Sequence, residues 1–254
     1  MAVDRPADSA QALVIVPTFN ESESIGEVAR RLFDAAEDAV DLLVVDDASP
    51  DGTAELVRAL AGGPHGIHLL ERPAKLGLGT AYVTGFQWAR ERGYRAVVEM
   101  DADLSHDPRD VMRLLEGLDD ADLVIGSRYV QGGSVENWGP FRRKLSALGN
   151  WYARSMLRFP VRDSTSGFRA YRMELLGEEQ LRGVSSHGYA FQIEMTRRVF
   201  RRGARITEIP ITFIERATGQ SKMKSRIIVE AILRVTRWGL ADRFGRGRSG
   251  RTEP

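Results

Sequence analysis

The chain has 254 residues, 43% of them hydrophobic, and a formal net charge of +1 at pH 7. This length and composition allow a sizeable buried core and exclude a disordered or fibrous protein. The sequence contains no cysteine, which excludes disulfides, thiolate metal sites and a cysteine nucleophile. No apolar run reaches the roughly 20 residues of a membrane span, and the polar first ten residues predict no secretory signal.

The near-neutral total conceals an uneven distribution of charge. Residues 1–60 carry 4 basic and 13 acidic side chains, whereas residues 128–172 carry 9 and 2 and residues 205–254 carry 11 and 5. This asymmetry indicates that the later parts of the chain face an anionic partner. An ordinary solvated surface on each part is the alternative.

Short apolar runs alternate with amphipathic stretches over the first half of the chain. The apolar runs predict five strands, at 12–16, 42–47, 66–70, 96–101 and 122–127. Helical spacing of apolar residues predicts four intervening helices, at 22–39, 51–61, 79–92 and 108–117. This order is typical of a parallel α/β sheet with right-handed crossovers, in which ligands bind beyond the carboxyl ends of the strands.

The alternation stops near residue 128. The later pattern predicts helices and one further strand, namely helices at 141–158, 189–202 and 225–240 and a strand at 206–214. Residues 243–254 are rich in glycine and arginine and are predicted to be disordered. With no internal repeat and no clear linker, residues 1–242 are expected to form one domain.

Polar side chains follow four of the predicted strands at the expected ligand-binding edge: Asn20 and Glu21, Asp46 and Asp47, Asp101 and Asp103, and Arg128. Asp101 and Asp103 can point at a common Mg²⁺ or Mn²⁺ ion, which takes one or two carboxylates and completes its shell with water and substrate phosphates. Acidic pairs are common in surface turns, so the argument depends on their position after a buried strand. His106, nearby, is expected to be a solvated loop or N-cap residue.

Two other segments at this edge have structural interpretations. The run SPDGT forms a turn into a helix, with Asp51 as the expected N-cap. Gly77, Gly79 and Gly85 do not make a dinucleotide loop, because Tyr82 stands where the third glycine belongs. They indicate close packing at a helix N-terminus, which also favours a nearby phosphate.

Basic and aromatic residues are interleaved after residue 128, namely Arg128, Trp138, Phe141, Arg142, Arg143, Lys144, Trp151 and Tyr152. As a cluster beside acidic residues they favour phosphate contact, although an interfacial membrane surface also fits. A basic loop with Arg216, Lys222 and Lys224 can close over a diphosphate. The last helix carries an apolar stripe formed by Ile227, Ile228, Ala231, Ile232 and Val235. Core packing is its default role, and contact with a membrane surface is the alternative.

Seven segments in this order resemble those of dolichol- and polyprenol-phosphate mannosyltransferases: VPTFNE, VVDDASPDGT, MDADLSHDP, GSRY, DSTSGFRAY, GYAFQIEM and RATGQSK. The resemblance spans roughly residues 12–240. It implies the GT-A fold of family-2 glycosyltransferases, with a nucleotide-binding half at about 12–128 and an acceptor-binding half at about 129–242. It also implies GDP-mannose as donor, Mg²⁺ or Mn²⁺ as cofactor and a polyprenyl phosphate as acceptor.

The resemblance also implies residue roles, position by position. Binding of the guanosine is carried over to Pro17, Phe19, Glu21, Val45 and Asp47. Binding of the diphosphate is carried over to Asp101, Ala102, Asp103, Arg216 and Lys222. Metal ligands are carried over to Asp101, Asp103 and Ser105, catalytic roles to Asp103, Arg128, Arg216 and Lys222, and acceptor-phosphate contacts to Arg128, Arg142 and Ser146. Two positions depart from the pattern: Phe19 replaces a frequent tyrosine, and Ser105 replaces the glutamine ligand of some relatives.

The implied reaction is a single displacement at C1 of mannose with inversion. A phosphate oxygen is already anionic at pH 7, which agrees with a sequence that shows no evident catalytic histidine. We expect a peripheral enzyme on the cytoplasmic face of the membrane, docked through its basic later half, with a separate membrane-anchoring protein as a further partner and no nucleic acid. The alternatives are a UDP-glucose-dependent glucosyltransferase on the same acceptor and a non-catalytic nucleotide-sugar or lipid-phosphate binding module.

Overall fold

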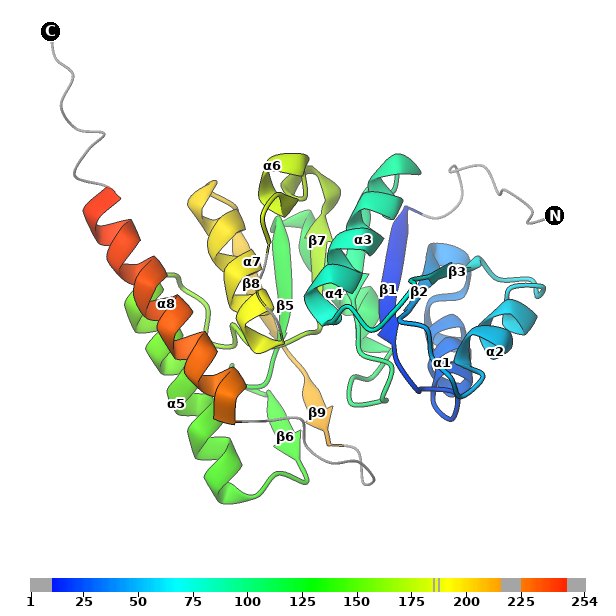
Figure 1. Ribbon diagram of the computed structural model, residues 1–254, viewed down its shortest axis with the longest axis horizontal. Helices are drawn as coiled ribbons and strands as arrows, with labels where there is room; N and C mark the ends of the chain where they lie inside the picture. Colours follow the sequence, from blue (N-terminus) through cyan, green and yellow to red (C-terminus); the bar gives the residue numbers. More distant parts are fainter. Residues whose placement is uncertain (1–10, 185, 187, 216–224, 246–254) are drawn as a thin grey trace, which may run out of the picture.

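The computed structural model describes residues 11–184, 186, 188–215 and 225–245. Its centre is a seven-stranded sheet covered by helices on both faces (Figure 1). In sheet order the strands are β3 (Ile67–Glu71), β2 (Val40–Asp46), β1 (Ala12–Thr18), β4 (Ala96–Glu99), β7 (Arg169–Arg172), β5 (Leu123–Ser127) and β8 (Ile206–Pro210). Only β7 runs antiparallel to its neighbours β4 and β5. The predicted mostly parallel α/β sheet of the GT-A type is confirmed.

Two apolar cores lie on opposite faces of the sheet because alternate strand residues point to opposite sides. Val14 and Val44 face the core under α1 (Ile25–Ala36), α2 (Thr53–Leu60) and α4 (Asp110–Glu116). Ile15 and Leu43 face the other core, which is covered by α3 (Leu78–Glu91), α5 (Pro140–Leu157), α6 (Glu178–Leu181), α7 (Tyr189–Arg201) and α8 (Ser225–Gly245). Short 3₁₀ helices span Glu37–Ala39, Gly117–Asp119 and Met173–Leu175.

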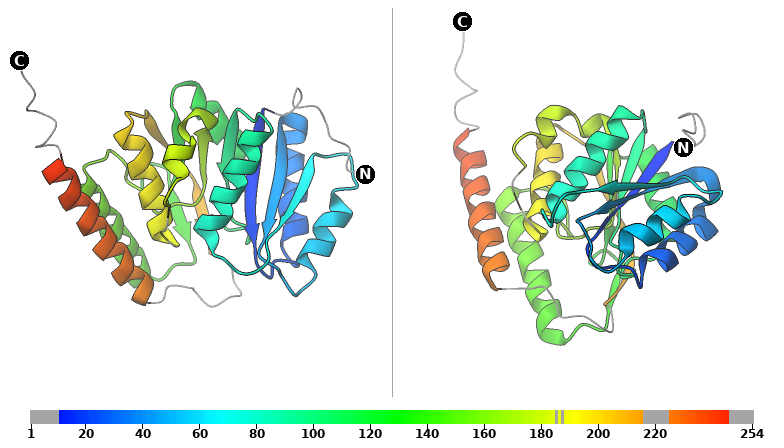
Figure 2. Two further views of the ribbon diagram at one scale, coloured as in Figure 1. Left: turned by 45° about the horizontal axis from the view of Figure 1, so that its top comes forward. Right: turned by 45° about the vertical axis from the view of Figure 1, so that its right-hand side comes forward.

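The helices α5 and α8 lie side by side at the end of the molecule beyond β8, away from β3, in both views of Figure 2. A two-stranded parallel sheet, β6 (Ser134–Glu136) with β9 (Thr212–Ile214), lies below the same end of the main sheet in Figure 1. None of the helices in the described part of the chain combines the length and apolar character needed to cross a bilayer.

Several predicted boundaries are wrong in detail. The first helix begins at Ile25 rather than residue 22, because residues 20–22 form a loop held by the segment 49–53. The predicted strand 206–214 is divided at Ile211, whose N–H bonds to Ser127 O while its side chain is buried. The last helix continues to Gly245, so residues 243–245 of the tail predicted to be disordered are helical; residues 246–254 lie outside the described residues.

Replacing Gly85 with alanine is expected to lower the free energy of unfolding by about 1–3 kcal/mol, the usual cost of overpacking a core. A Cβ at this position would lie 2.7 Å from Ile15 Cγ2, which agrees with the close packing expected of this glycine. Gly26→Ala in α1 is the matched control, since its Cβ would meet only Leu56 at 4.0 Å. Urea unfolding of both variants measures the difference, and equal stability of the two would contradict the prediction.

Candidate active site

The functional residues gather at the carboxyl ends of β1, β2, β4 and β5. The strand order reverses between β1 and β4, since the chain adds β2 and β3 on one side of β1 before returning to the other. Such switch points are where open α/β sheets bind ligands. The antiparallel strand β7 begins at this same edge, so the segment 163–168 that precedes it also lies at the site.

Asp46 and Asp47, at the end of β2, are both buried and hydrogen-bonded. Asp46 accepts bonds from the Thr18 and Ser49 hydroxyls, at 2.8 and 2.6 Å, and from the Ser49 N–H. Asp47 forms an ion pair with Arg72, whose Nε lies 2.5 Å from Oδ1, and accepts the backbone N–H groups of residues 76 and 77 at 3.2 and 3.3 Å. Asp47 therefore holds the loop at residues 76 and 77, and its carboxylate can bond directly to a ligand only if one of these partners is exchanged.

The loop at residues 20–22 is held by the turn that follows β2. The backbone N–H groups of Asn20, Glu21 and Ser22 donate to side-chain oxygens of Ser49, Thr53 and Asp51, at 3.0–3.1 Å. Asp51 also accepts the Thr53 N–H, although Gly52 rather than Asp51 occupies the N-cap position. Burial would raise the pKa of Asp51, but hydrogen bonds from Thr53 and Ser22 hold that pKa at about 2. The structural role expected of this turn is confirmed, with the cap position shifted by one residue.

Three further residues carried over to the nucleotide end differ in exposure. Pro17 and Phe19, at the end of β1, are partly exposed, and the Lys75 ammonium lies 3.6 Å from the centroid of the Phe19 ring. Val45 has no exposed surface and packs in the core on the α3 face. Val45 is therefore in the core and cannot contact a ligand directly, whereas Phe19 is accessible at the sheet edge. Sequence reasoning missed Lys75 and Arg72, which no motif marked.

Asp101 and Asp103 lie in the loop after β4, which ends at Glu99. Both carboxylates are partly exposed, and Ala102 between them is buried. Asp103 Oδ1 accepts the Ser105 N–H at 3.0 Å. The Ser105 hydroxyl is buried and has no hydrogen-bond partner in the described part of the chain.

The prediction that His106 is a solvated loop or N-cap residue is wrong. His106 is 3% exposed, stacks on Phe168 at a centroid distance of 4.8 Å, and accepts the Asp101 N–H through Nδ1 at 3.2 Å. The N-cap of α4 is Arg109. Burial lowers the pKa of His106 to about 4, against the opposing effect of Asp103. The neutral imidazole therefore supports the loop from below.

A buried polar cluster lies beneath the Asp101 loop. Glu99, fully buried, accepts a 2.6 Å bond from the Gln192 amide. The Arg169 guanidinium, also fully buried, donates to Ser166 O, Gln192 O and the Thr196 hydroxyl. Burial raises the pKa of Glu99 to about 8 despite Arg169. These groups tie β4 and β7 to α7 next to the strand end from which the Asp101 loop starts.

The donor set after β4 suits a hard divalent cation. Asp101 and Asp103 supply oxygen ligands, and the unpartnered Ser105 hydroxyl lies in the same loop. Among the described residues, no three or more histidine, aspartate or glutamate side chains form a group that could hold a metal alone. A site with one or two carboxylates is typical of Mg²⁺ and related ions that also bind substrate phosphates. The residues present therefore fit the expected cation.

Arg128, directly after β5, is buried beside the Asp163 carboxylate. Its Nε and Nη2 donate to the two carboxylate oxygens, each at 2.7 Å, and Nη2 also donates to the Thr165 hydroxyl at 2.9 Å. Burial alone would lower the pKa of Arg128, but Asp163 raises it above the ordinary value. Conversely, burial would raise the pKa of Asp163, and Arg128 holds it below the usual range.

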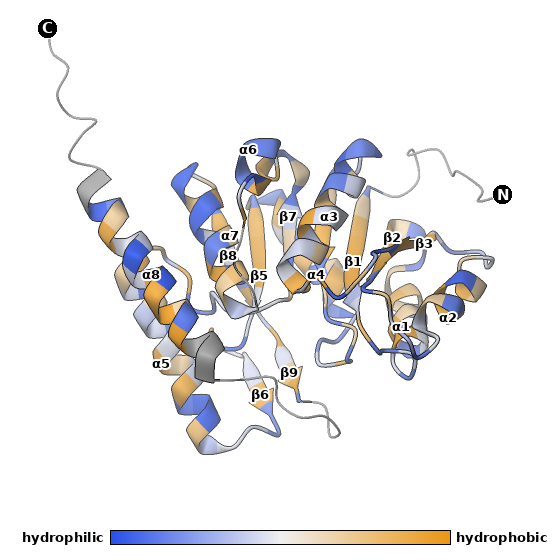
Figure 3. Ribbon diagram, viewed as in Figure 1, coloured by the Kyte–Doolittle hydropathy of each residue, from blue (hydrophilic) through white to orange (hydrophobic). Residues whose placement is uncertain are grey.

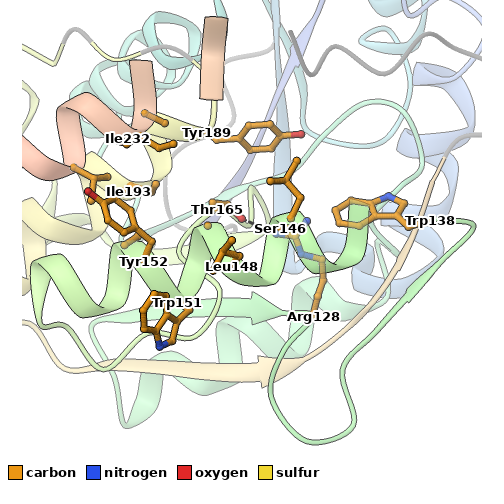
Figure 4. Close-up of a pocket in the computed structure, with 15 residues that line it drawn as sticks. Arg128, Trp138, Ser146, Leu148, Trp151, Tyr152, Thr165, Tyr189, Ile193 and Ile232 are labelled. Atoms are coloured by element: carbon orange, nitrogen blue, oxygen red, sulfur yellow. Dashed lines mark hydrogen bonds between the residues drawn. The ribbon is translucent and has the colours of Figure 1, made fainter. Parts of the chain in front are cut away.

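Arg128 lies at the polar end of an otherwise apolar groove of about 370 Å³ between α5 and α8 (Figure 4). Ser146 and Thr165 also line the groove, and the Asn150 amide donates to the Ser146 backbone carbonyl and to the Thr165 hydroxyl. Apolar and aromatic side chains form the rest of the lining: Trp138, Leu145, Leu148, Trp151, Tyr152, Ala153, Tyr189, Ile193, Ala231, Ile232 and Val235. Sequence periodicity treated several of these as core, because core and groove residues share the same helical spacing.

The three residues carried over to the acceptor phosphate are only partly brought together. Arg128 and Ser146 both line the groove, and Ser146 Oγ accepts a 2.7 Å bond from the Tyr129 hydroxyl. Arg142 does not line the groove. It forms an ion pair with Glu215, and its Cζ atom lies 4.3 Å from the centroid of the Trp138 ring. Arg216 and Lys222 lie outside the described residues. Ile214, two residues before Arg216, lies next to the loop that carries Asp101 and Asp103, because its N–H donates to Ser105 O.

Comparison with known proteins places this geometry in context. The glycosyl transferase family 2 model matches residues 13–179. An undecaprenyl-phosphate mannosyltransferase of Micrococcus luteus is 50% identical over 92% of this chain and 96% of its own length. A polyprenol monophosphomannose synthase of Mycolicibacterium smegmatis is 48% identical over 94% of this chain and 90% of its own. A dolichol-phosphate mannosyltransferase of Pyrococcus furiosus is 37% identical, and 65% of its length is matched.

Solved structures share the fold at lower sequence identity. A glucosyl-3-phosphoglycerate synthase of Mycobacterium tuberculosis, in complex with Mn²⁺, UDP-glucose and phosphoglyceric acid, superposes with a TM-score of 0.63 at 22% identity. The match covers 91% of this chain and 81% of that one. A further complex of that synthase with Mn²⁺ and UDP-glucose gives a TM-score of 0.64.

Proposed function

This chain belongs to glycosyl transferase family 2, among its polyprenyl-phosphate mannosyltransferases, and we propose that it transfers mannose from GDP-mannose to a polyprenyl phosphate with inversion. The products are polyprenyl β-phosphomannose and GDP. The observation that carries this proposal is the apolar groove with Arg128 at its polar end, at the same sheet edge as the Asp101 loop. An isoprenoid phosphate matches that groove, because it combines a long apolar chain with one anionic head.

The donor occupies the β1–β2–β4 part of the edge. Pro17, Phe19, Glu21 and Asp47 are assigned to the guanosine end, with Val45 supporting them from the core. Asp101 and Asp103, with Ser105 and the backbone at Ala102, are assigned to Mg²⁺ or Mn²⁺ and the diphosphate. When bound, the cation supplies electrostatic stabilisation of the charge that develops on the leaving diphosphate. Arg216 and Lys222 are assigned to the same charge.

The acceptor needs no general base in this reaction. A phosphate monoester oxygen is anionic at pH 7, so it attacks C1 directly, the bond from C1 to the GDP oxygen breaks, and no proton has to be removed. His106 and Glu99, whose pKa values are shifted toward neutrality of the side chain at pH 7, are both buried, and neither lines the groove. Arg128 and Ser146 hold the phosphate; the assignment of Arg142 requires it to leave Glu215.

The deciding assay mixes the purified protein with labelled GDP-mannose, Mg²⁺ or Mn²⁺ and a short polyprenyl phosphate. We expect labelled mannose in the organic phase, in a form released by mild acid. Transfer from UDP-glucose without transfer from GDP-mannose would reject the donor assignment in favour of the glucosyltransferase. Binding of the nucleotide sugar with no transfer from either donor would favour the non-catalytic alternative.

We further propose that the α5–α8 end docks on a membrane surface, where its lipid substrate resides. Exposed apolar side chains recur there at helical spacing, namely Phe141, Leu148 and Trp151 on α5 and Val229, Leu233 and Leu240 on α8. Hydrophobic and hydrophilic residues alternate along the ribbons of both helices (Figure 3). Exposed basic side chains accompany them at Arg143, Lys144 and Arg237. Apolar groups beside lysine and arginine are typical of helices that lie in the interface of anionic bilayers.

The double variant Phe141→Glu/Leu233→Glu is expected to bind anionic vesicles at least tenfold more weakly than the native chain. Each substitution removes an exposed apolar anchor, 79% and 65% exposed respectively, and adds a charge that the surface repels. A loss of about 1.4 kcal/mol already corresponds to tenfold. Co-sedimentation with vesicles containing phosphatidylglycerol measures the effect. Leu76→Glu, an exposed apolar residue outside α5 and α8, is the control, and equal binding of all three proteins would reject the docking surface.

A further inference from the structure

We propose that Asp163 is a positioning residue for the acceptor: it clamps the Arg128 guanidinium so that only its Nη1 edge is presented to the phosphate in the groove. The inference rests on the proposed function for the identity of the acceptor. None of the motif roles carried over from related enzymes included Asp163, although it begins the segment DSTSGFRAY.

The clamp uses three of the five N–H groups of Arg128. The Nε–H and one Nη2–H donate to the two oxygens of Asp163, and the second Nη2–H donates to the Thr165 hydroxyl. The Asp163 carboxylate also accepts the Arg128 backbone N–H at 2.9 Å, so it fixes both ends of the residue. Nη1 has no hydrogen-bond partner within the described residues, and Arg128 lines the groove (Figure 4). The guanidinium therefore has one edge available for a ligand.

The clamp is itself held on several sides. The Glu208 carboxylate on β8 accepts the backbone N–H groups of Arg162 and Asp163, at 2.7 and 2.8 Å. Asn150 on α5 donates to the Thr165 hydroxyl and accepts from the Ser164 hydroxyl, at 3.1 and 3.0 Å. These contacts connect the segment before β7 to strand β8 and to helix α5, which lines the groove.

Aromatic rings enclose the same guanidinium. The Arg128 Cζ atom lies 5.4 Å from the Trp138 ring centroid, 5.5 Å from that of Phe213 and 5.6 Å from that of Tyr129. Asp163 is 0% exposed and Arg128 is 7% exposed. Because the Nε and Nη2 atoms of Arg128 are paired with Asp163 and aromatic rings lie close by, the guanidinium has little freedom to turn. A phosphate that binds the Nη1 edge is consequently oriented as well as held.

This arrangement has a catalytic consequence because in-line attack depends on where the phosphate oxygen lies. A displacement of about 1 Å in such a reaction can reduce the rate a hundredfold. A neutral amide at position 163 can accept only one of the two bonds that the Arg128 guanidinium donates to Asp163, so the guanidinium turns. The alternative is that the pair only ties β5 to the segment before β7, in which case its loss changes stability and leaves the acceptor parameters unchanged.

The test compares Asp163→Asn with Asp122→Asn. Both aspartates pair with an arginine and flank β5, but Asp122 lies at the opposite end of that strand and pairs with the exposed Arg205. We expect Asp163→Asn to lower kcat/KM for the polyprenyl phosphate at least tenfold and to change KM for GDP-mannose less than twofold. Asp122→Asn is expected to leave both within twofold. In an Arg128→Lys background, Asp163→Asn is expected to have less than a twofold further effect, because the group it positions is gone.

Direct binding of geranyl phosphate, followed by tryptophan fluorescence, gives a readout that needs no donor. Weaker binding by Asp163→Asn than by the native chain and Asp122→Asn supports the clamp even if GDP-mannose proves to be the wrong donor. No binding of the prenyl phosphate by the native chain rejects the proposed acceptor, and the clamp with it. If Asp163→Asn does not fold, Thr165→Val decides: acceptor binding and turnover both within 1.5-fold of native would overturn the clamp, and a threefold or larger loss in either would support it.

Discussion

Asp103→Ala is expected to lower turnover at least a thousandfold while leaving the fold intact. The carboxylate is partly exposed and its one described bond is to the Ser105 N–H, so its loss costs little stability. A thousandfold loss corresponds to about 4 kcal/mol of transition-state stabilisation, which is the scale of a bound cation acting on a leaving diphosphate. The measurement is mannose transfer at saturating substrates with Mg²⁺ or Mn²⁺, alongside circular dichroism.

Asp107→Ala is the control for this effect. Asp107 lies four residues further along the same loop and pairs with exposed Arg109, and its replacement is expected to keep turnover within about threefold. Adding a chelator to the native protein should reproduce the loss seen in Asp103→Ala, and restoring the cation should reverse it only in the native protein. A fully active Asp103→Ala enzyme would contradict the metal site.

Asp47→Asn is expected to lower the free energy of unfolding by about 3 kcal/mol and to weaken GDP-mannose binding at least tenfold. Breaking a buried ion pair by removing one partner typically costs about 3–5 kcal/mol, because the other charge stays buried. Here the remaining charge is Arg72, whose side chain is 5% exposed. Oδ2 of Asp47 accepts the backbone N–H groups of residues 76 and 77, while Oδ1 accepts from Arg72. An amide has only one acceptor oxygen, so it can keep the loop or the Arg72 contact but not both.

Thermal unfolding and calorimetric titration of GDP-mannose measure the two effects of Asp47→Asn. The stability loss corresponds to roughly 6–12 °C in Tm for a chain of this size. Asp34→Asn in α1 is the matched control, since its partner Arg30 is 59% exposed and exposed ion pairs contribute about 0–1 kcal/mol. Equal Tm values for the two variants would show that the Asp47–Arg72 pair does not stabilise the nucleotide end.

The first half of the fold could be predicted because its strands are uniform apolar runs. Both faces of a central parallel strand are covered, so segments such as 42–45 contain only apolar residues. The strand β7 escaped prediction because its sequence is Arg-Ala-Tyr-Arg and a buried guanidinium looks like a surface residue in a sequence. Arg169 is buried only because Gln192, Thr196 and Ser166 accept its hydrogen bonds, and these partners lie up to 27 residues away.

Residues at the sheet edge could be located from the sequence where they are close together along the chain. They could not be located where their contacts are with residues far away in the sequence. The Asp101–Asp103 pair follows a recognisable strand, so its location was found from local pattern alone. The position of His106 was misjudged because its neighbours Phe168 and Phe213 come from segments more than 60 residues away. Asp163 was overlooked for the same reason, since its partner Arg128 is 35 residues earlier.

The antiparallel strand β7 lies between the two strands that carry the proposed donor and acceptor residues. Ala170 is in register with Val98 on β4 and with Val124 on β5, so one strand is hydrogen-bonded to the supports of both the Asp101 loop and Arg128. Two strand spacings separate β4 from β5, about 9.5 Å. In mechanical terms β7 is a spacer: on the proposed assignments, the strands that carry the donor and acceptor ends can separate only if their hydrogen bonds to β7 break.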